Sequence, residues 1–169
     1  MEYVIVMKVG PHSGMSLEDI IKSKIEEEKN HGVHYWGYSG VFCLPNKVQE
    51  FCEKKKVKLV LLETKSAYDS DIGFISGYSI NSKDVIKFEK PVQLQGAKYS
   101  FVAKNINIIN DFNIDNYIVC YGKNEGKRLS EHLKFRVNKS FAKKVSNNNG
   151  TGKALVCDLV YPYGIYLHE

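Results

Sequence analysis

The chain has 169 residues, of which 43% are hydrophobic and 25% charged, as is typical of a globular protein with a sizeable core. No apolar run approaches the roughly 20 residues that a membrane-spanning helix needs, and the first apolar segment does not resemble a secretory signal. We therefore expect a cytoplasmic protein, a single domain over residues 1–169, with no membrane partner. The net charge of +5 comes almost entirely from lysine, which is compatible with anionic partners but disfavours base reading by arginine.

The first 62 residues predict an alternation of strands and helices. Nearly continuous apolar runs at 3–9 and 57–62 are typical of central strands. Ser16 as N-cap and Gly32 at the C-terminal end bound a first helix, and Pro45 is suited to the first turn of a second. The apolar stripe of the first helix is predicted to comprise Leu17, Ile20, Ile21 and Ile25. The charged residues are predicted to lie mostly outward: Lys22, Lys24, Glu26, Glu27 and Glu28.

The stretch at 31–43 combines aromatic residues with glycines. If it is a strand, its two-residue period places His34, Trp36, Tyr38 and Phe42 on one face. Glycines within a strand mark a bulge or a close approach by backbone or ligand. Two interpretations remain open: the floor of a pocket for a flat, polar ligand, or an aromatic core with a histidine at its rim.

The rest of the chain predicts short strands followed by one more helix. Residues 64–110 are interpreted as antiparallel hairpins, 105–116 as a surface excursion, and 117–121 as a strand. Leu129, Leu133, Val137 and Phe141 stand at four-residue steps and predict a helix. A last strand is expected at 155–160, and the tyrosine-rich end that follows is typical of a lid or of a homo-oligomer interface. The whole pattern predicts an α+β fold, with an α/β-like N-terminal half and a mixed sheet on which about three helices pack.

Two glycine-containing loops are expected where a strand leads into a helix, a place where free backbone N–H groups bind anions. The first, at 10–16, offers His12 and Ser13; the second, at 122–128, offers Lys123, Lys127 and Arg128. The second loop is not a Walker A motif, because three residues rather than four separate its glycines and Arg128 stands where Ser or Thr would hold magnesium. Ordinary capping and solvated charges are the alternative interpretation of both loops.

No motif predicts catalysis or metal binding. There is no recognised serine or cysteine nucleophile signature, the four cysteines form no close pair, and the five histidines lack metalloprotease spacing. We therefore predict no catalytic residue, no metal ligand and no cofactor. Whether the protein is an enzyme stays open, with binding favoured over turnover.

These features predict non-enzymatic binding of a small phosphorylated, nucleotide-like ligand. A sensor of a signal nucleotide would fit, and so would a viral protein that sequesters one to counter host defence. The predicted ligand-binding residues are His12, Ser13, His34, Trp36, Tyr38, Lys123, Lys127 and Arg128.

Two alternatives remain open. The first is an RNA- or DNA-binding module that uses a basic helix at 127–144 and stacking tyrosines. The second is a nucleotide hydrolase or phosphodiesterase with His12, His34 or His132 as acid–base groups.

Overall fold

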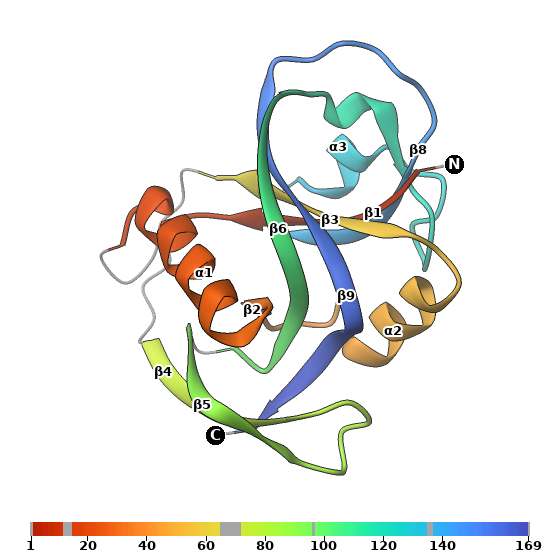
Figure 1. Ribbon diagram of the computed structural model, residues 1–169. Helices are drawn as coiled ribbons and strands as arrows, with labels where there is room; N and C mark the ends of the chain where they lie inside the picture. The colour runs from red at the N-terminus through yellow and green to blue at the C-terminus, as the bar shows by residue number, and fades with distance from the viewer. Residues whose placement is uncertain (1, 12–14, 65–71, 96, 135–136, 169) are drawn as a thin grey trace. The chain divides into compact units, whose positions relative to one another are not determined.

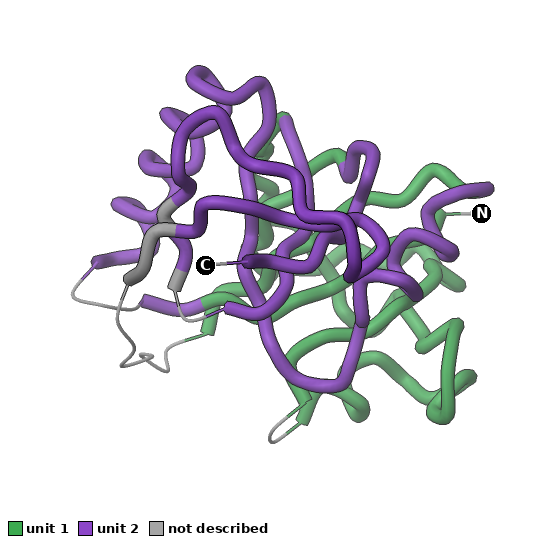
Figure 2. The backbone as a smooth tube through the Cα atoms, turned by 90° about the horizontal axis from the view of Figure 1, so that it is seen from below, with its two compact units in different colours: residues 1–9, 55–64, 105–158 green, residues 10–54, 65–104, 159–169 purple. Residues whose placement is uncertain are grey.

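The computed structural model describes residues 2–11, 15–64, 72–95, 97–134 and 137–168. Over these ranges the chain forms a mixed sheet of nine strands, three α-helices and one short 3-10 helix (Figure 1). This confirms the predicted α+β class. The chain divides into two compact units (Figure 2): unit 1 comprises Met1–Val9, Lys55–Thr64 and Asn105–Asp158, and unit 2 comprises Gly10–Lys54, Lys65–Lys104 and Leu159–Glu169. No observation tests the expectation of a single domain, and each unit is described by itself.

Unit 1 is built on a parallel pair of apolar strands. The strands β1 (Tyr3–Val9) and β3 (Val57–Glu63) run in parallel, as their continuous hydrophobicity predicts. β1 also pairs antiparallel with β8 (Lys139–Lys144), which pairs with β7 (Tyr117–Val119). On the other side, β3 pairs antiparallel with the first half of β9 (Gly152–His168).

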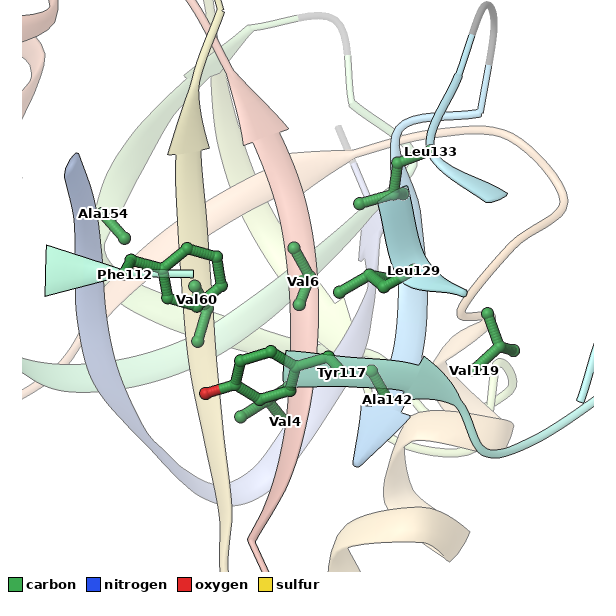
Figure 3. Packing of buried hydrophobic residues seen from close by; sticks show 10 residues of the cluster. All are labelled: Val4, Val6, Val60, Phe112, Tyr117, Val119, Leu129, Leu133, Ala142 and Ala154. Carbon is green, nitrogen blue, oxygen red and sulfur yellow. The ribbon is translucent and has the colours of Figure 1, made fainter. Parts of the chain in front are cut away.

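The core of unit 1 lies on one face of these strands. Val4 and Val6 of β1 are fully buried there, beside Leu129 of α3 (Leu129–His132). Figure 3 shows these side chains pointing toward one another with those of the neighbouring strands. The complete cluster of buried residues is Val4, Val6, Val60, Phe112, Tyr117, Val119, Leu129, Leu133, Ala142 and Ala154.

One prediction for this part of the chain is wrong. The helix expected to continue from Leu129 to Phe141 ends at His132, and Phe141 lies in β8 instead. The segment around Phe141 is a strand because β8 pairs with β1, and a four-residue spacing within the segment cannot predict a pairing with a distant part of the chain. The segment at 105–116, whose structure the sequence left open, is mostly exposed or half-buried, as expected of a surface excursion. The strand β6 (Tyr99–Phe112) runs through most of it, and the 3-10 helix η1 (Ile114–Asn116) follows.

Unit 2 contains the two longer helices and the aromatic strand. Its elements are α1 (Leu17–His31), β2 (His34–Tyr38), α2 (Pro45–Glu53), β4 (Ile72–Ser79), β5 (Ile86–Gln95), the first part of β6 and the last part of β9. β2 pairs antiparallel with β6, and β4 pairs antiparallel with β5 and with β9. A buried apolar cluster in this unit comprises Tyr35, Ile75, Val92, Leu94, Val102 and Ile165.

The helix ends of unit 2 follow their sequence signals. Oγ of Ser16 accepts a 3.2 Å hydrogen bond from the N–H of Asp19. Gly32 ends α1 with a left-handed φ of +80°, and its N–H donates to the carbonyl of Glu28 at 2.8 Å. Pro45 opens α2, as predicted. None of the helices in the described ranges is long and apolar enough to cross a membrane.

The tyrosine-rich C-terminal end is part of a strand. Residues 161–166 lie within β9, where Tyr166 pairs with Ser79 of β4. Backbone pairing within unit 2 holds Tyr166, and the expected role of the segment as a lid stays a prediction. Its expected role as a homo-oligomer interface stays a prediction.

Candidate functional site

The buried side of α1 carries charged residues. Ile20 and Lys24 are buried on successive turns, and the next turn places Glu27 and Glu28 on the same side of the helix. Lys24 is only 7% exposed, whereas Ile25 is 46% exposed. The predicted apolar stripe, which included Ile25 and turned Lys24 outward, is therefore wrong in its last turn.

Lys24 is held by one carboxylate and one aromatic ring. Its Nζ lies 3.6 Å from Oε1 of Glu27 and 5.4 Å from the centroid of the Trp36 ring, within the range of a cation–π contact. Oε1 of Glu27 also accepts a 2.7 Å hydrogen bond from the backbone N–H of Tyr35, which ties α1 to β2. Burial lowers the pKa of Lys24 and raises the pKa of Glu27, while their mutual attraction opposes both shifts.

His34 makes the second contact between α1 and β2. Its side chain is fully buried, and its Nδ1 lies 2.8 Å from Oε1 of Glu28. Because a carboxylate only accepts hydrogen bonds, Nδ1 carries the proton and donates it. Burial lowers the pKa of His34, although the hydrogen bond to Glu28 acts in the opposite direction. The ring is therefore neutral near pH 7, and its Nε2 is an acceptor.

Two buried ring nitrogens on this face of β2 have no hydrogen-bond partner among the described residues. They are Nε2 of His34 and Nε1 of Trp36. The two rings are in edge-to-face contact, with centroids 5.9 Å apart and an interplanar angle of 85°. One nitrogen is an acceptor and the other a donor. We refer to Lys24, Glu27, Glu28, His34 and Trp36 as the α1–β2 cluster.

Two buried ring nitrogens without a partner would be costly to folding. An unsatisfied buried polar group costs about 1–3 kcal/mol, so the two would together cost about 2–6 kcal/mol if neither found a partner. That is a large share of the roughly 5–15 kcal/mol that stabilises a typical domain. Native proteins rarely leave such groups without a partner, and each exception calls for an explanation. A bound ligand that hydrogen-bonds to both nitrogens would explain why the described chain leaves them without a partner.

The third predicted residue of β2 is engaged within the protein. Tyr38 is 5% exposed, its hydroxyl donates to the carbonyl of Cys43, and its ring stacks on Phe101 with centroids 4.4 Å apart. Burial raises the pKa of Tyr38 well above its usual range. Phe42, which was predicted to share this face, lies beyond the end of β2 and is 37% exposed.

The glycine of β2 allows a close approach of the chain to itself. A Cβ added at Gly37 would lie 2.8 Å from Cβ of Ala97. Of the two predicted reasons for a glycine in this strand, close approach by another part of the chain is therefore the one that the structure shows.

The second predicted anion loop lies in unit 1, between β7 and α3. The backbone N–H groups of Glu125, Gly126 and Lys127 all donate to carbonyls of β7 or of the loop itself, at 2.8–3.2 Å. The helix that follows has only four residues. Lys123, Lys127 and Arg128 are exposed, so the loop offers surface cations while these backbone donors are already used.

The predicted residues fall into separate groups. His34, Trp36 and Tyr38 lie together on β2 in unit 2, whereas the three cations of the second loop lie in unit 1. His12 and Ser13 lie outside the described residues. His132 is 5% exposed in α3 of unit 1, where burial, helped by Lys127, lowers its pKa.

Sequence reasoning missed the three charged residues of α1. The available signal was their spacing, because Lys24 stands seven residues after Leu17 on the buried stripe and Glu27 follows at a salt-bridge distance along the helix. Spacing alone does not separate a buried lysine from one whose head reaches solvent over an apolar stem. The charged groups of α1 are buried because they contact His34 and Trp36, and these contacts form only when α1 packs on β2.

Neither a metal centre nor a relative identifies this site. Within the ranges that the structure describes, no group of three or more His, Cys, Asp or Glu side chains is arranged to hold a metal ion. No family model, curated protein or solved structure matches this chain.

Proposed function

We propose that this protein binds a small phosphorylated, nucleotide-like ligand and holds it without chemical change. The protein would act as a sensor of a signal nucleotide, or would sequester one, as a viral protein that counters host defence signalling would do. The observation that supports the proposal is the pair of buried nitrogens, Nε2 of His34 and Nε1 of Trp36, for which the described chain supplies no partner. The pair offers one acceptor and one donor beside an aromatic ring, which suits a flat, polar group.

A binding experiment with recovery of the ligand tests the proposal. The purified protein is incubated with mono-, di- and cyclic nucleotides, separated from free ligand by gel filtration, and heated to release what it holds. Chromatography then identifies the released molecule. We expect one nucleotide class to be retained and recovered unchanged. If none is retained when the protein is loaded at millimolar nucleotide, the proposal is wrong.

A nucleotide hydrolase is the second candidate, and the contact between Glu28 and His34 favours it. A carboxylate that accepts from Nδ1 fixes the tautomer and leaves Nε2 able to take a proton, which is the arrangement of a general base. The same chromatography separates the two candidates, because a hydrolase returns product instead of the intact ligand. For this candidate, His34→Gln should abolish product formation.

The nucleic-acid alternative gains no support from the described residues. It depended on a basic helix over 127–144, whereas the structure has a four-residue helix and the strand β8 there. Binding to RNA or DNA would show a steep loss of affinity with salt, a behaviour that the nucleotide proposal does not require.

A further inference from the structure

We infer that the α1–β2 cluster binds the heterocyclic edge of a nucleotide-like ligand, through one accepted and one donated hydrogen bond, and does not bind its phosphate. The inference rests on the proposed function, and it names the part of the ligand that this site recognises. It is carried by the buried acceptor and donor of two touching rings, together with the two carboxylates beside them.

The polarity of the two nitrogens selects the complementary group. Nδ1 of His34 donates to Glu28, so Nε2 needs a donor from the ligand. Nε1 of Trp36 is donor only, so it needs an acceptor. The rings of His34 and Trp36 are in edge-to-face contact, with centroids 5.9 Å apart. We infer that a single group presenting a donor beside an acceptor serves both nitrogens. The edges of nucleobases present donors and acceptors in this way.

A nucleotide phosphate meets only one of the two requirements. Its ionised oxygens are acceptors, so they would satisfy Nε1 of Trp36 but would place lone pairs against Nε2 of His34. The charge balance of the cluster also opposes an anion. Glu27 and Glu28 contribute two carboxylates, whereas Lys24 contributes one ammonium group that is already paired with Glu27. The neutral edge of a heterocycle can offer both a donor and an acceptor, and it carries no charge for the carboxylates to repel.

The buried position of the cluster sets the mode of entry. Lys24, His34 and Trp36 are all buried, so a heterocycle reaches the two nitrogens only after a local opening within unit 2. The phosphate of the ligand then remains outside the cluster, and the nucleoside alone carries the recognised group.

The single tryptophan of the chain provides a direct reporter. Because Trp36 is the only tryptophan, its indole N–H gives one assignable signal in a ¹H–¹⁵N spectrum. The protein is titrated with adenosine, guanosine, cytidine and uridine, with their 5′-monophosphates, and with inorganic phosphate and pyrophosphate. We expect at least one nucleoside to shift the indole signal and to raise the melting temperature. Phosphate and pyrophosphate should leave the indole signal in place.

Variants of one strand separate recognition from folding. Trp36→Phe removes the donor, and we expect about fivefold to tenfold weaker binding of the responding nucleoside, the effect of one hydrogen bond. Tyr35→Phe is the matched control, because Tyr35 lies on the opposite face of β2 and packs in the other buried cluster. It should bind like the wild type. The indole signal of the wild type tests the inference even if Trp36→Phe does not fold.

The outcomes separate this inference from the proposed function. If nucleotides bind while nucleosides do not, or if the responding nucleoside leaves the indole signal unmoved, the inference is wrong and the proposed function stands. If no nucleoside or nucleotide binds, both are wrong. Binding of inorganic phosphate that shifts the indole signal would also overturn the inference.

Discussion

Lys24 and Glu27 form a buried ion pair whose two members depend on each other. Their side chains are 9% and 10% exposed, so neither charge is solvated if its partner is lost. Glu27 also accepts a hydrogen bond from the backbone N–H of Tyr35, so it joins α1 to β2 alongside the contact of Glu28 with His34. His34, the buried histidine beside this pair, is neutral near pH 7 because burial disfavours its charged form.

Removal of Glu27 should therefore be costly. Glu27→Ala leaves the ammonium group of Lys24 buried without its carboxylate, and we expect the free energy of unfolding to fall by about 3–5 kcal/mol. Urea denaturation measures the change. Glu26→Ala is the control, because Glu26 is exposed on the same helix turn and should change stability by no more than about 0.5 kcal/mol. Equal effects of the two substitutions would show that the buried pair does not hold α1 on β2.

The lowered pKa of His34 predicts the direction of a pH effect. The unfolded chain binds a proton near the ordinary pKa of about 6.5, whereas the folded chain binds it only at lower pH. The stabilising contribution is thus fully present above about pH 6.5 and is lost as pH falls through the folded pKa. The charged groups near His34 are Glu28, which opposes the shift, and Lys24, which adds to it.

We expect His34→Gln to flatten the loss of stability between neutral pH and about pH 5. Denaturation midpoints of the wild type and the variant, measured at matched pH values, check this. His132 in unit 1 contributes with the same sign, so the difference between the two proteins isolates the share of His34. A pH dependence that is unchanged in His34→Gln would contradict the assignment of a neutral, buried ring.

At the scale of elements, the sequence predicted correctly the strands and helix ends that depend on neighbouring residues. The apolar runs of β1 and β3, the N-cap of α1 at Ser16 and the proline of α2 were all interpreted correctly. The helix expected through Phe141 failed because β8 exists through its pairing with β1, a contact distant in sequence. The charged residues of the α1–β2 cluster were missed for a related reason, because Lys24 is buried only where α1 packs on β2.

The C-terminal end of α1 gives a prediction at this scale. Gly32 has φ of +80°, and an added Cβ would meet nothing within 4 Å, so only backbone strain opposes a side chain there. Gly32→Ala should lower the free energy of unfolding by about 1–2 kcal/mol. Gly32→Asn should cost less, because asparagine tolerates the left-handed region better. Thermal unfolding compares the two, and equal losses would mean that strain at this position is not the cause.

At the scale of the whole molecule, the predicted binding residues fall in two units. His34, Trp36 and Tyr38 belong to unit 2, and Lys123, Lys127 and Arg128 belong to unit 1. Sequence patterns identified both groups by residue type and spacing. They could not show that the aromatic group is buried against a charged helix face, or that the loop in unit 1 uses backbone donors for its own turn. His34 and Trp36, the two predicted residues within the α1–β2 cluster, are therefore the ones that support a specific proposal.

The most direct test of the proposal is thermal unfolding of the wild type, Trp36→Phe and Tyr35→Phe, each with and without mono-, di- and cyclic nucleotides. A nucleotide present at about 100 times its dissociation constant should stabilise the wild type and Tyr35→Phe by about 2.7 kcal/mol. Trp36→Phe, which lacks the buried donor, should gain clearly less. If no nucleotide stabilises the wild type, or if all three proteins gain equally, the α1–β2 cluster is not the binding site.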